Sequence, residues 1–194
     1  MTSGPALVQA APALPADDPF ASISRRSFAW IVDVVLVTVL VFVVVSAVDA
    51  VLGPTVAFRP EAATLQDTVA VDKNLVVVDA LFATAVSAAY FVLPWALLGG
   101  SPAQLALRLR VRGDAGGGAL PVGRALARWI LLFPPFATVS ALAAGVPLVG
   151  WLVWGGALVW YLVLLLTTAW SETNQGLHDR LAGSVVHKSR AAAG

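Results

Sequence analysis

The stretch RRSFAWIVDVVLVTVLVFVVVSAVDAVL, residues 25–52, decides the fold. Its apolar part, from Phe28 to Leu52, is long enough to cross a bilayer as a helix, which takes about 20 residues. Arg26 and Asp33 are two helical turns apart, so their side chains lie on one face of this helix. An unpaired carboxylate costs roughly 2.5–3.5 kcal/mol at the centre of a membrane helix. Asp33 therefore needs a partner, a proton or a function.

The composition indicates a membrane protein. The chain is 59% hydrophobic and only 12% charged, whereas soluble domains carry about 25% charged residues, and its mean hydropathy is +0.85. The absence of cysteine excludes disulfides and thiolate metal sites, and His178 and His187 lack the spacing of a metal site. We expect no metal, cofactor or nucleic-acid partner. The sequence has no nucleotide motif and no pattern of nucleophile and base, so we do not expect an enzyme.

The predicted fold is an all-α polytopic membrane protein with four transmembrane helices and a small cytoplasmic two-stranded element. The four apolar segments are 28–52, 75–98, 125–146 and 148–170. The third is interrupted by Pro134 and Pro135, which favours a kinked span or an interfacial helix followed by a short span. Residues 1–24 and 189–194 are expected to be disordered tails around a single membrane domain, 25–188.

The distribution of basic residues predicts the orientation. Basic residues precede the first span, fill the loop 99–124 and follow the fourth span, whereas acidic residues outnumber Arg59 and Lys73 in the loop 53–74. The positive-inside rule then places both termini and the loop 99–124 in the cytoplasm of a bacterial cell. A fourth span agrees with this charge pattern, because three spans would put the C-terminal basic residues outside.

Four charged residues are candidates for a substrate or ion pathway: Arg26, Asp33, Asp79 and Arg128. Arg128 is placed at a depth similar to that of Asp33, so it is a candidate partner across the bundle, as is Arg26 on the same helix. The alternative is that these charges form a structural ion pair that orients the first helix. Asp79 stands among apolar neighbours near the outer start of the second span, and Asp49 is expected to be solvated at the interface.

The cytoplasmic loop and the tail are expected to pair as strands. Residues 107–112 alternate apolar and basic side chains, which is typical of a half-buried strand. Residues 184–187 also favour a strand, and each segment is too short to be stable alone. Asp179 and Arg180 precede the second strand, where Asp179 can reach an arginine of the loop or of the turn before the third span. We select Arg124 as that partner.

Three motifs together resemble the RDD family of bacterial membrane proteins, which is named for one arginine and two aspartates. The first motif contains Arg26 and Asp33, and the last, LHDRLAG (177–183), contains Asp179. The central resemblance runs from Gly99 to Arg128. Where the family usually has a glycine and two basic residues after the proline at position 102, this chain has Ala103-Gln104-Leu105.

The resemblance implies a polytopic inner-membrane protein, and for some members it implies transport by cation–proton exchange. Our leading hypothesis is a membrane protein that moves a cation, a proton or a small solute by means of Asp33. The alternative is a non-transporting scaffold or accessory subunit of a membrane complex. The expected partners are the lipid bilayer and either a second copy of the chain or a membrane complex, because a chain this short needs self-association to enclose a pathway.

Overall fold

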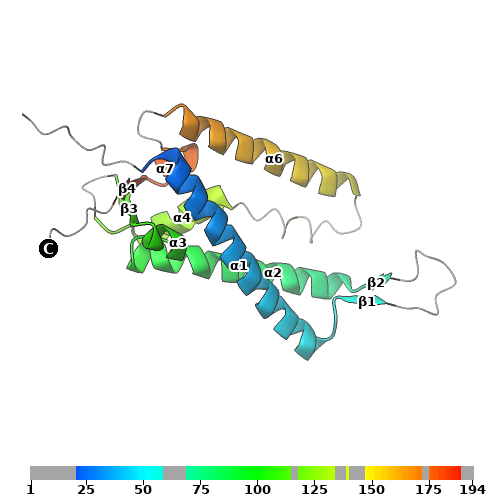
Figure 1. The fold of residues 1–194 in the computed structure, drawn as a ribbon. Helices are drawn as coiled ribbons and strands as arrows, with labels where there is room; N and C mark the ends of the chain where they lie inside the picture. Colours follow the sequence, from blue (N-terminus) through cyan, green and yellow to red (C-terminus); the bar gives the residue numbers. More distant parts are fainter. Residues whose placement is uncertain are drawn as a thin grey trace, which may run out of the picture.

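The computed structural model describes residues 21–58, 69–114, 118–133, 139, 147–171 and 175–188 of the 194-residue chain. Most of the predicted N-terminal tail, the whole of the predicted C-terminal tail and most of the second half of segment 125–146 lie outside these residues. Within the described ranges the fold is mostly helical. Two small two-stranded sheets lie at opposite ends of the helices (Figure 1).

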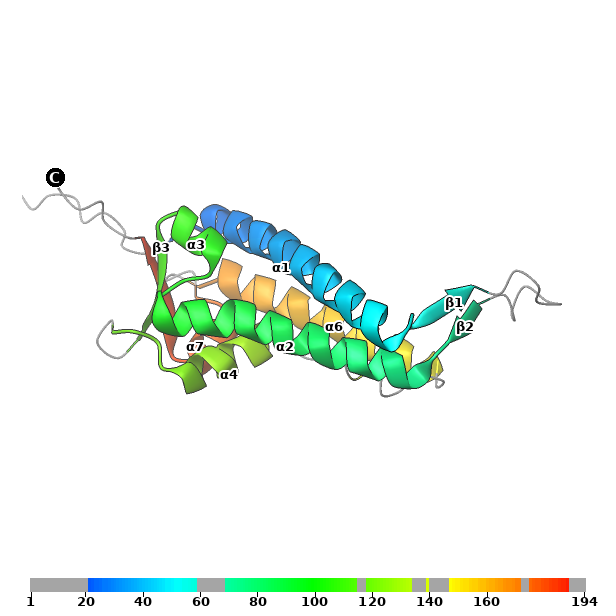
Figure 2. The same cartoon turned by 90° about the horizontal axis from the view of Figure 1, so that it is seen from below.

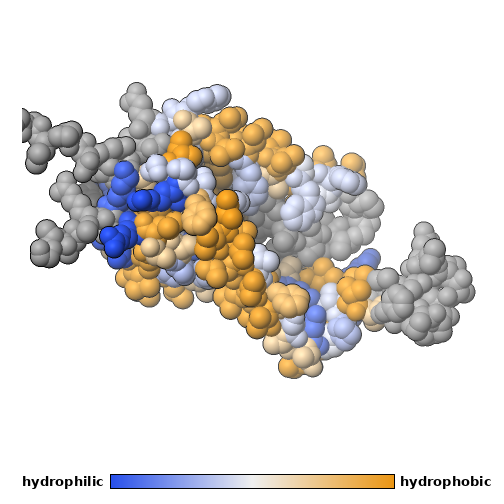
Figure 3. Space-filling view, in the orientation of Figure 1, coloured by the Kyte–Doolittle hydropathy of each residue, from blue (hydrophilic) through white to orange (hydrophobic). Residues whose placement is uncertain are grey.

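Three long helices run along the molecule: α1 (Ile23–Leu52), α2 (Lys73–Leu97) and α6 (Pro147–Ala169) (Figure 1, Figure 2). Each is long and apolar enough to cross a bilayer. Their outward faces expose large apolar side chains, which form the orange surface of Figure 3. Soluble proteins rarely leave so extensive an apolar surface uncovered. In lipid, by contrast, a helix satisfies its own backbone groups even in a run of valines.

The third predicted span begins as a short helix, α4 (Val122–Leu132). Its 11 residues make about 16 Å of helix, which is less than the ~30 Å of a hydrocarbon core. The helix packs against α2 and buries Ala125, Arg128 and Trp129. Among the described residues, therefore, three helices have the length of a span instead of the predicted four. Most of the rest of the predicted third span lies outside those residues.

A hairpin follows α1 at one end of the molecule. Strands β1 (Val56–Phe58) and β2 (Val69–Val71) pair in antiparallel fashion, with Val56 opposite Val71. The helix α2 starts directly after this hairpin. Its N-cap, Asp72, accepts hydrogen bonds from the backbone N–H groups of Asn74 at 2.9 Å and Leu75 at 3.3 Å. These bonds satisfy donors that the first helical turn leaves free.

The other end carries four short elements that we call the platform: α3 (Pro102–Ala106), β3 (Leu109–Gly113), α7 (Leu177–Leu181) and β4 (Ser184–Lys188). Strands β3 and β4 pair in antiparallel fashion, with Val111 opposite Val186. This confirms the predicted pairing of loop and tail. The segment ahead of α1 joins the sheet, because the N–H of Ala21 bonds to the carbonyl oxygen of Val186 at 3.2 Å. Ala21 thus belongs to the fold, although it lies in the stretch predicted as a tail.

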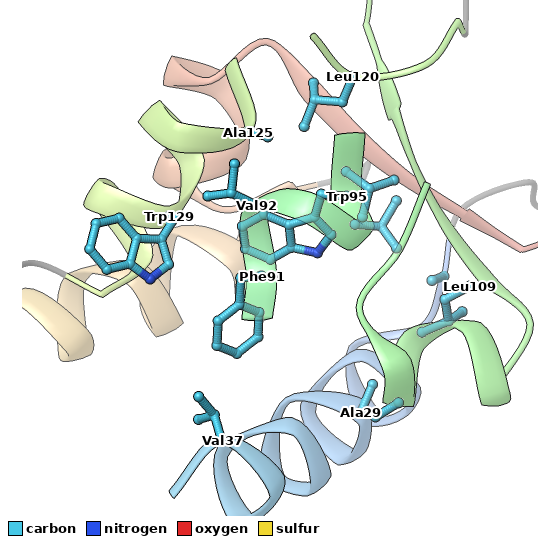
Figure 4. Packing of buried hydrophobic residues seen from close by; sticks show 13 residues of the cluster. Ala29, Val37, Phe91, Val92, Trp95, Leu109, Leu120, Ala125 and Trp129 are labelled. Atoms are coloured by element: carbon cyan, nitrogen blue, oxygen red, sulfur yellow. The ribbon is translucent and has the colours of Figure 1, made fainter. Parts of the chain in front are cut away.

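The hydrophobic core lies at the platform end of the helices (Figure 4). Phe91 and Trp95 of α2 are buried between α1, α4 and the sheet, with ring centroids 5.2 Å apart. Phe91 also stacks on Phe133 at 4.6 Å. Leu109 and Val111 of β3 add the apolar side of the sheet to the same cluster. The platform is therefore fixed to the helices by a shared core.

Candidate functional site

Asp33 is buried where α1 passes the N-terminus of α3. Its Oδ1 accepts hydrogen bonds from the hydroxyl of Tyr90 at 2.9 Å and from the backbone N–H of Ala103 at 3.1 Å, and the hydroxyl of Ser101 donates to Oδ2. These three donors satisfy the carboxylate from α2 and from the start of α3. Asp33 thus acts as a cap for α3 that comes from another helix.

The local sequence of α3 explains why a carboxylate fits there. Ser101 is the N-cap and Pro102 the first helical residue, which is a common start for a helix. Gln104 closes the turn, because its Oε1 accepts hydrogen bonds from the N–H of Ser101 at 3.0 Å and from Nε1 of Trp95 at 2.9 Å. The amide of Gln104 therefore takes a structural role in the segment where the resemblance led us to expect basic residues.

A buried ion cluster lies beside this cap. Nη1 of Arg128, on α4, is 2.7 Å from Oδ1 of Asp179, on α7, and Nη2 of Arg26, on α1, contacts the other carboxylate oxygen. Arg128 and Asp179 are fully buried, and the side chain of Arg26 is 12% exposed. Arg128 also donates to the hydroxyl of Ser184 at 2.8 Å, and its guanidinium lies 4.9 Å from the Trp95 ring centre. One carboxylate thus joins α1, α4 and α7.

This cluster corrects the predicted pairing of Asp33. We expected Arg26 or Arg128 to be the partner of Asp33, but Arg128 pairs with Asp179 and the polar contacts of Asp33 come from α2 and α3. The reason is the fold of the tail, which returns α7 to the start of α1. Asp179 then lies next to Arg26, whereas Asp33 is two turns farther along α1, or about 10 Å.

Two positive charges share one negative charge in the cluster. Burial alone would raise the pKa of Asp179, but Arg128, His178 and Arg26 outweigh that effect and hold the pKa well below its usual range. His178 lies with Nε2 3.4 Å from Oδ1 of Asp179. Burial lowers its pKa to about 4; Asp179 opposes this shift, and Arg128 and Arg26 reinforce it. At neutral pH the ring is uncharged, so the positive charges in the cluster are those of Arg26 and Arg128.

The predicted partner of Asp179 is also wrong. Arg124 lies at the exposed rim, where Nη1 is 3.1 Å from Oδ1 of Asp114 and 3.3 Å from the carbonyl oxygen of Gly183. Arg124 and Arg128 are one turn apart on α4, and the inner position is the one that reaches Asp179. Arg180 is exposed and donates from Nη2 to the hydroxyl of Ser171 at 3.0 Å.

Asp79 is in the second turn of α2, next to the β1–β2 hairpin, and this end of α2 lies opposite the platform end that carries α7 (Figure 1). The hydroxyl of Thr55, in the turn after α1, contacts Oδ2 of Asp79 and lies 3.0 Å from Oδ1 of Asp49. Asp49 is thus half-buried and bonded, where we expected a solvated side chain. The other oxygen of Asp79, Oδ1, is buried and has no hydrogen-bond partner in the described part of the chain.

A cavity of about 290 Å³ opens next to the ion cluster, between α1, α4, α6 and α7. Arg26, Arg128 and His178 line its polar end, and Trp30 and Leu164 are among its apolar walls. Sequence reasoning missed this cavity together with the roles of Tyr90, Ser101, His178 and Ser184. Of these residues, only Ser101 could have been recognised from the sequence. A serine followed by proline, with a glutamine three residues after the serine, is typical of the start of a helix.

The family comparison covers the same residues. The model of the RDD family matches residues 20–183, which run from just ahead of α1 to the turn after α7. The chain belongs to the RDD family. Searches of curated proteins and of solved structures gave no match. In this RDD protein the arginine of the first motif, Arg26, binds the aspartate of the last, Asp179, and the first aspartate, Asp33, caps α3.

Proposed function

We propose that this RDD protein is a four-span protein of the bacterial inner membrane that serves as a scaffold or accessory subunit of a membrane complex. In this proposal both termini and the platform lie in the cytoplasm. The partner is a second copy of the chain or another subunit of the complex, bound in the plane of the membrane. The exposed apolar faces of α1 and α6 are available for such contact.

One observation carries the proposal. The charged side chains of the family motifs are already bonded to one another or to other groups of the protein. Asp179 is held between Arg26 and Arg128, and Asp33 is saturated by donors from α2 and α3. A transport group must exchange partners with its solute, and a buried carboxylate with three internal donors does so only at a high cost. These charges are better suited to fixing the platform beneath the helices.

The orientation is supported by the basic residues of the platform end. Arg25 and Arg26 start α1, Arg110 and Arg112 lie on β3, and Arg124 starts α4. Arginines gather in this way on the cytoplasmic side of membrane proteins. The test is labelling of single cysteines in intact cells with a thiol reagent that does not cross the membrane. A cysteine at Thr64 should react and one at Gly116 should be protected, and the reverse pattern would overturn the orientation.

A second candidate function, transport of a proton or a cation, is favoured by the carboxylates at the other end. The hydroxyl of Thr55 has a single hydrogen, yet its oxygen contacts carboxylate oxygens of both Asp49 and Asp79. The hydroxyl donates to only one of the two oxygens, so a cation shared by the two carboxylates would satisfy the other. A pair of carboxylates at the end of apolar helices could bind a proton or a cation from outside the membrane.

Flux through proteoliposomes distinguishes the two functions. Vesicles containing the wild type, Asp33→Asn or Asp79→Asn are loaded with dyes for H⁺, Na⁺ and K⁺ and compared with empty vesicles. The scaffold proposal expects all three proteins to match the empty vesicles. A flux that Asp79→Asn abolishes and Asp33→Asn retains would replace the scaffold with transport at the Asp79 end. A flux that Asp33→Asn abolishes, in a correctly folded protein, would restore the role first predicted for Asp33.

A further inference from the structure

The cavity beside the ion cluster has the size of a ligand site. Its volume is about 290 Å³, close to the lower limit of roughly 300–1,000 Å³ that is usual for small-molecule pockets. The helix α6 packs mainly on α7, and Nε1 of Trp160 links it to α4 by a hydrogen bond of 2.7 Å to the carbonyl oxygen of Leu131. The cavity lies along the side of α6 that faces α1 and α4.

The polar end of the cavity is cationic and incompletely bonded. Arg128 and His178 are more than nine-tenths buried and both line it. Nε of Arg128 and Nδ1 of His178 have no hydrogen-bond partner among the described residues. Buried polar atoms are nearly always paired with protein, water or a ligand. Nε of Arg128 is a hydrogen-bond donor beside the positive charges of Arg26 and Arg128, so this end of the cavity favours an anion that accepts a hydrogen bond.

The remaining walls are apolar and lead to the surface of the helices. Trp30 and Leu132 line one side, and Leu164 and Leu165 of α6 line the other. Trp30 is 39% exposed and Leu165 is 57% exposed, so the cavity opens between α1 and α6. Both helices have the length and composition of membrane spans, so this opening faces acyl chains in a bilayer. A ligand that fills the cavity therefore has an anionic head and an apolar chain.

We propose that this cavity binds an anionic phospholipid, with its headgroup phosphate at Arg26 and Arg128 and an acyl chain leaving between Trp30 and Leu165. Basic pockets between membrane helices on the cytoplasmic side are a known setting for such headgroups. The proposal assigns a ligand to the protein and stands whether or not the protein is a scaffold.

The test uses the purified full chain, delipidated in a neutral detergent. Phosphatidylglycerol or phosphatidylcholine with matched acyl chains is added, and bound lipid is counted by native mass spectrometry. We expect a preference of about tenfold for phosphatidylglycerol. Brominated acyl chains provide a second readout, because they should quench tryptophan fluorescence in the complex. Equal binding of the two lipids would overturn the proposal.

Matched variants locate the lipid. Leu165→Trp blocks the opening, whereas Leu162→Trp adds the same bulk to an exposed position of α6 that does not line the cavity. We expect Leu165→Trp to bind phosphatidylglycerol several-fold more weakly and Leu162→Trp to bind it like the wild type. Both positions are exposed on α6, so both variants should fold. Unchanged binding in Leu165→Trp would rule out this cavity as the lipid site.

Two competitors identify the anion. Inorganic phosphate at millimolar concentration should leave the bound phosphatidylglycerol in place, because it lacks the chain that fills the apolar walls. A fatty acid with the same acyl chain should displace it only at a large excess. Efficient displacement by phosphate would show that the cavity binds a free anion, and efficient displacement by the fatty acid would show a carboxylate site. Either result would overturn the assignment to a phospholipid.

Discussion

Arg26, in the first turn of α1, binds the carboxylate of Asp179, which follows it in the chain by 153 positions. Arg128 holds the other oxygen of the same carboxylate. The first and last helical elements of the fold are therefore joined at one buried point. The carboxylate of Asp179, on the five-residue helix α7, thereby holds α7 against α1 and α4.

Asp179→Asn should destabilise the protein strongly. The amide removes the negative charge and leaves two guanidinium groups close together, one of them fully buried. Breaking a buried pair in this way costs of order 3–5 kcal/mol. The control is Asp114→Asn, which breaks the exposed pair with Arg124 and should cost less than about 1 kcal/mol. Unfolding in detergent, followed by size-exclusion chromatography after heating, measures both. Similar midpoints for the two variants would contradict the finding.

The identity of the Arg128 partner can be tested by double substitution. Arg128→Ala leaves Asp179 with less compensation, so adding Asp179→Ala should restore part of the lost stability. Adding Asp33→Ala should instead give an additive loss, because Asp33 does not pair with Arg128. The free energies of unfolding of the singles and doubles provide the coupling energies. Rescue by Asp33→Ala and not by Asp179→Ala would support the pairing first predicted from sequence.

Removing the Asp33 carboxylate should loosen α3. Asp33→Ala leaves the N–H of Ala103 and the hydroxyl of Ser101 without their acceptor, at a cost of about 1–3 kcal/mol. The local effect should be faster tryptic cleavage after Arg108, at the end of the turn that follows α3. Asp72→Ala removes the cap of α2 at the far end and is the control. It should lower stability by about 1 kcal/mol without exposing Arg108.

Stability should fall as the pH is lowered from 6.5 to 4. The pKa of His178 is lowered to about 4 by burial, against an ordinary value of 6.5. Between these values the unfolded chain binds a proton that the folded chain does not, so acid favours unfolding, by about 3 kcal/mol across the window. The lowered pKa of Asp179 adds a loss only below its ordinary value of 3.8.

Two histidine variants check this pH dependence. His178→Gln removes the buried ring, so its stability should change less than that of the wild type between pH 6.5 and pH 4. The control is His187→Gln on β4, which removes a histidine that lines no part of the cluster's cavity. Chemical unfolding at a series of pH values gives both slopes. A slope that stays the same in His178→Gln would show that another group controls the acid response.

The sequence alone determined the membrane class, the three long helices and the pairing of loop with tail. These features follow from local pattern: continuous apolar runs for α1, α2 and α6, and alternation for β3. A single run of apolar residues in lipid forms a helix, because every backbone group must then be hydrogen-bonded within the segment. The alternation at Leu109–Arg112 marks a strand with one buried face, which needs a neighbour.

Only the tertiary structure decided which charges meet. From the sequence, Arg26 and Arg128 were the candidate partners of Asp33, and Arg124 was the candidate partner of Asp179, since each lies near the same end of the helices. The choice depends on the return of α7 beneath α1 and on which turn of α4 faces inward, and neither is encoded in residue spacing. A charge selects its partner by distance in space, and in this chain the deciding contact joins residues that the sequence holds 153 positions apart.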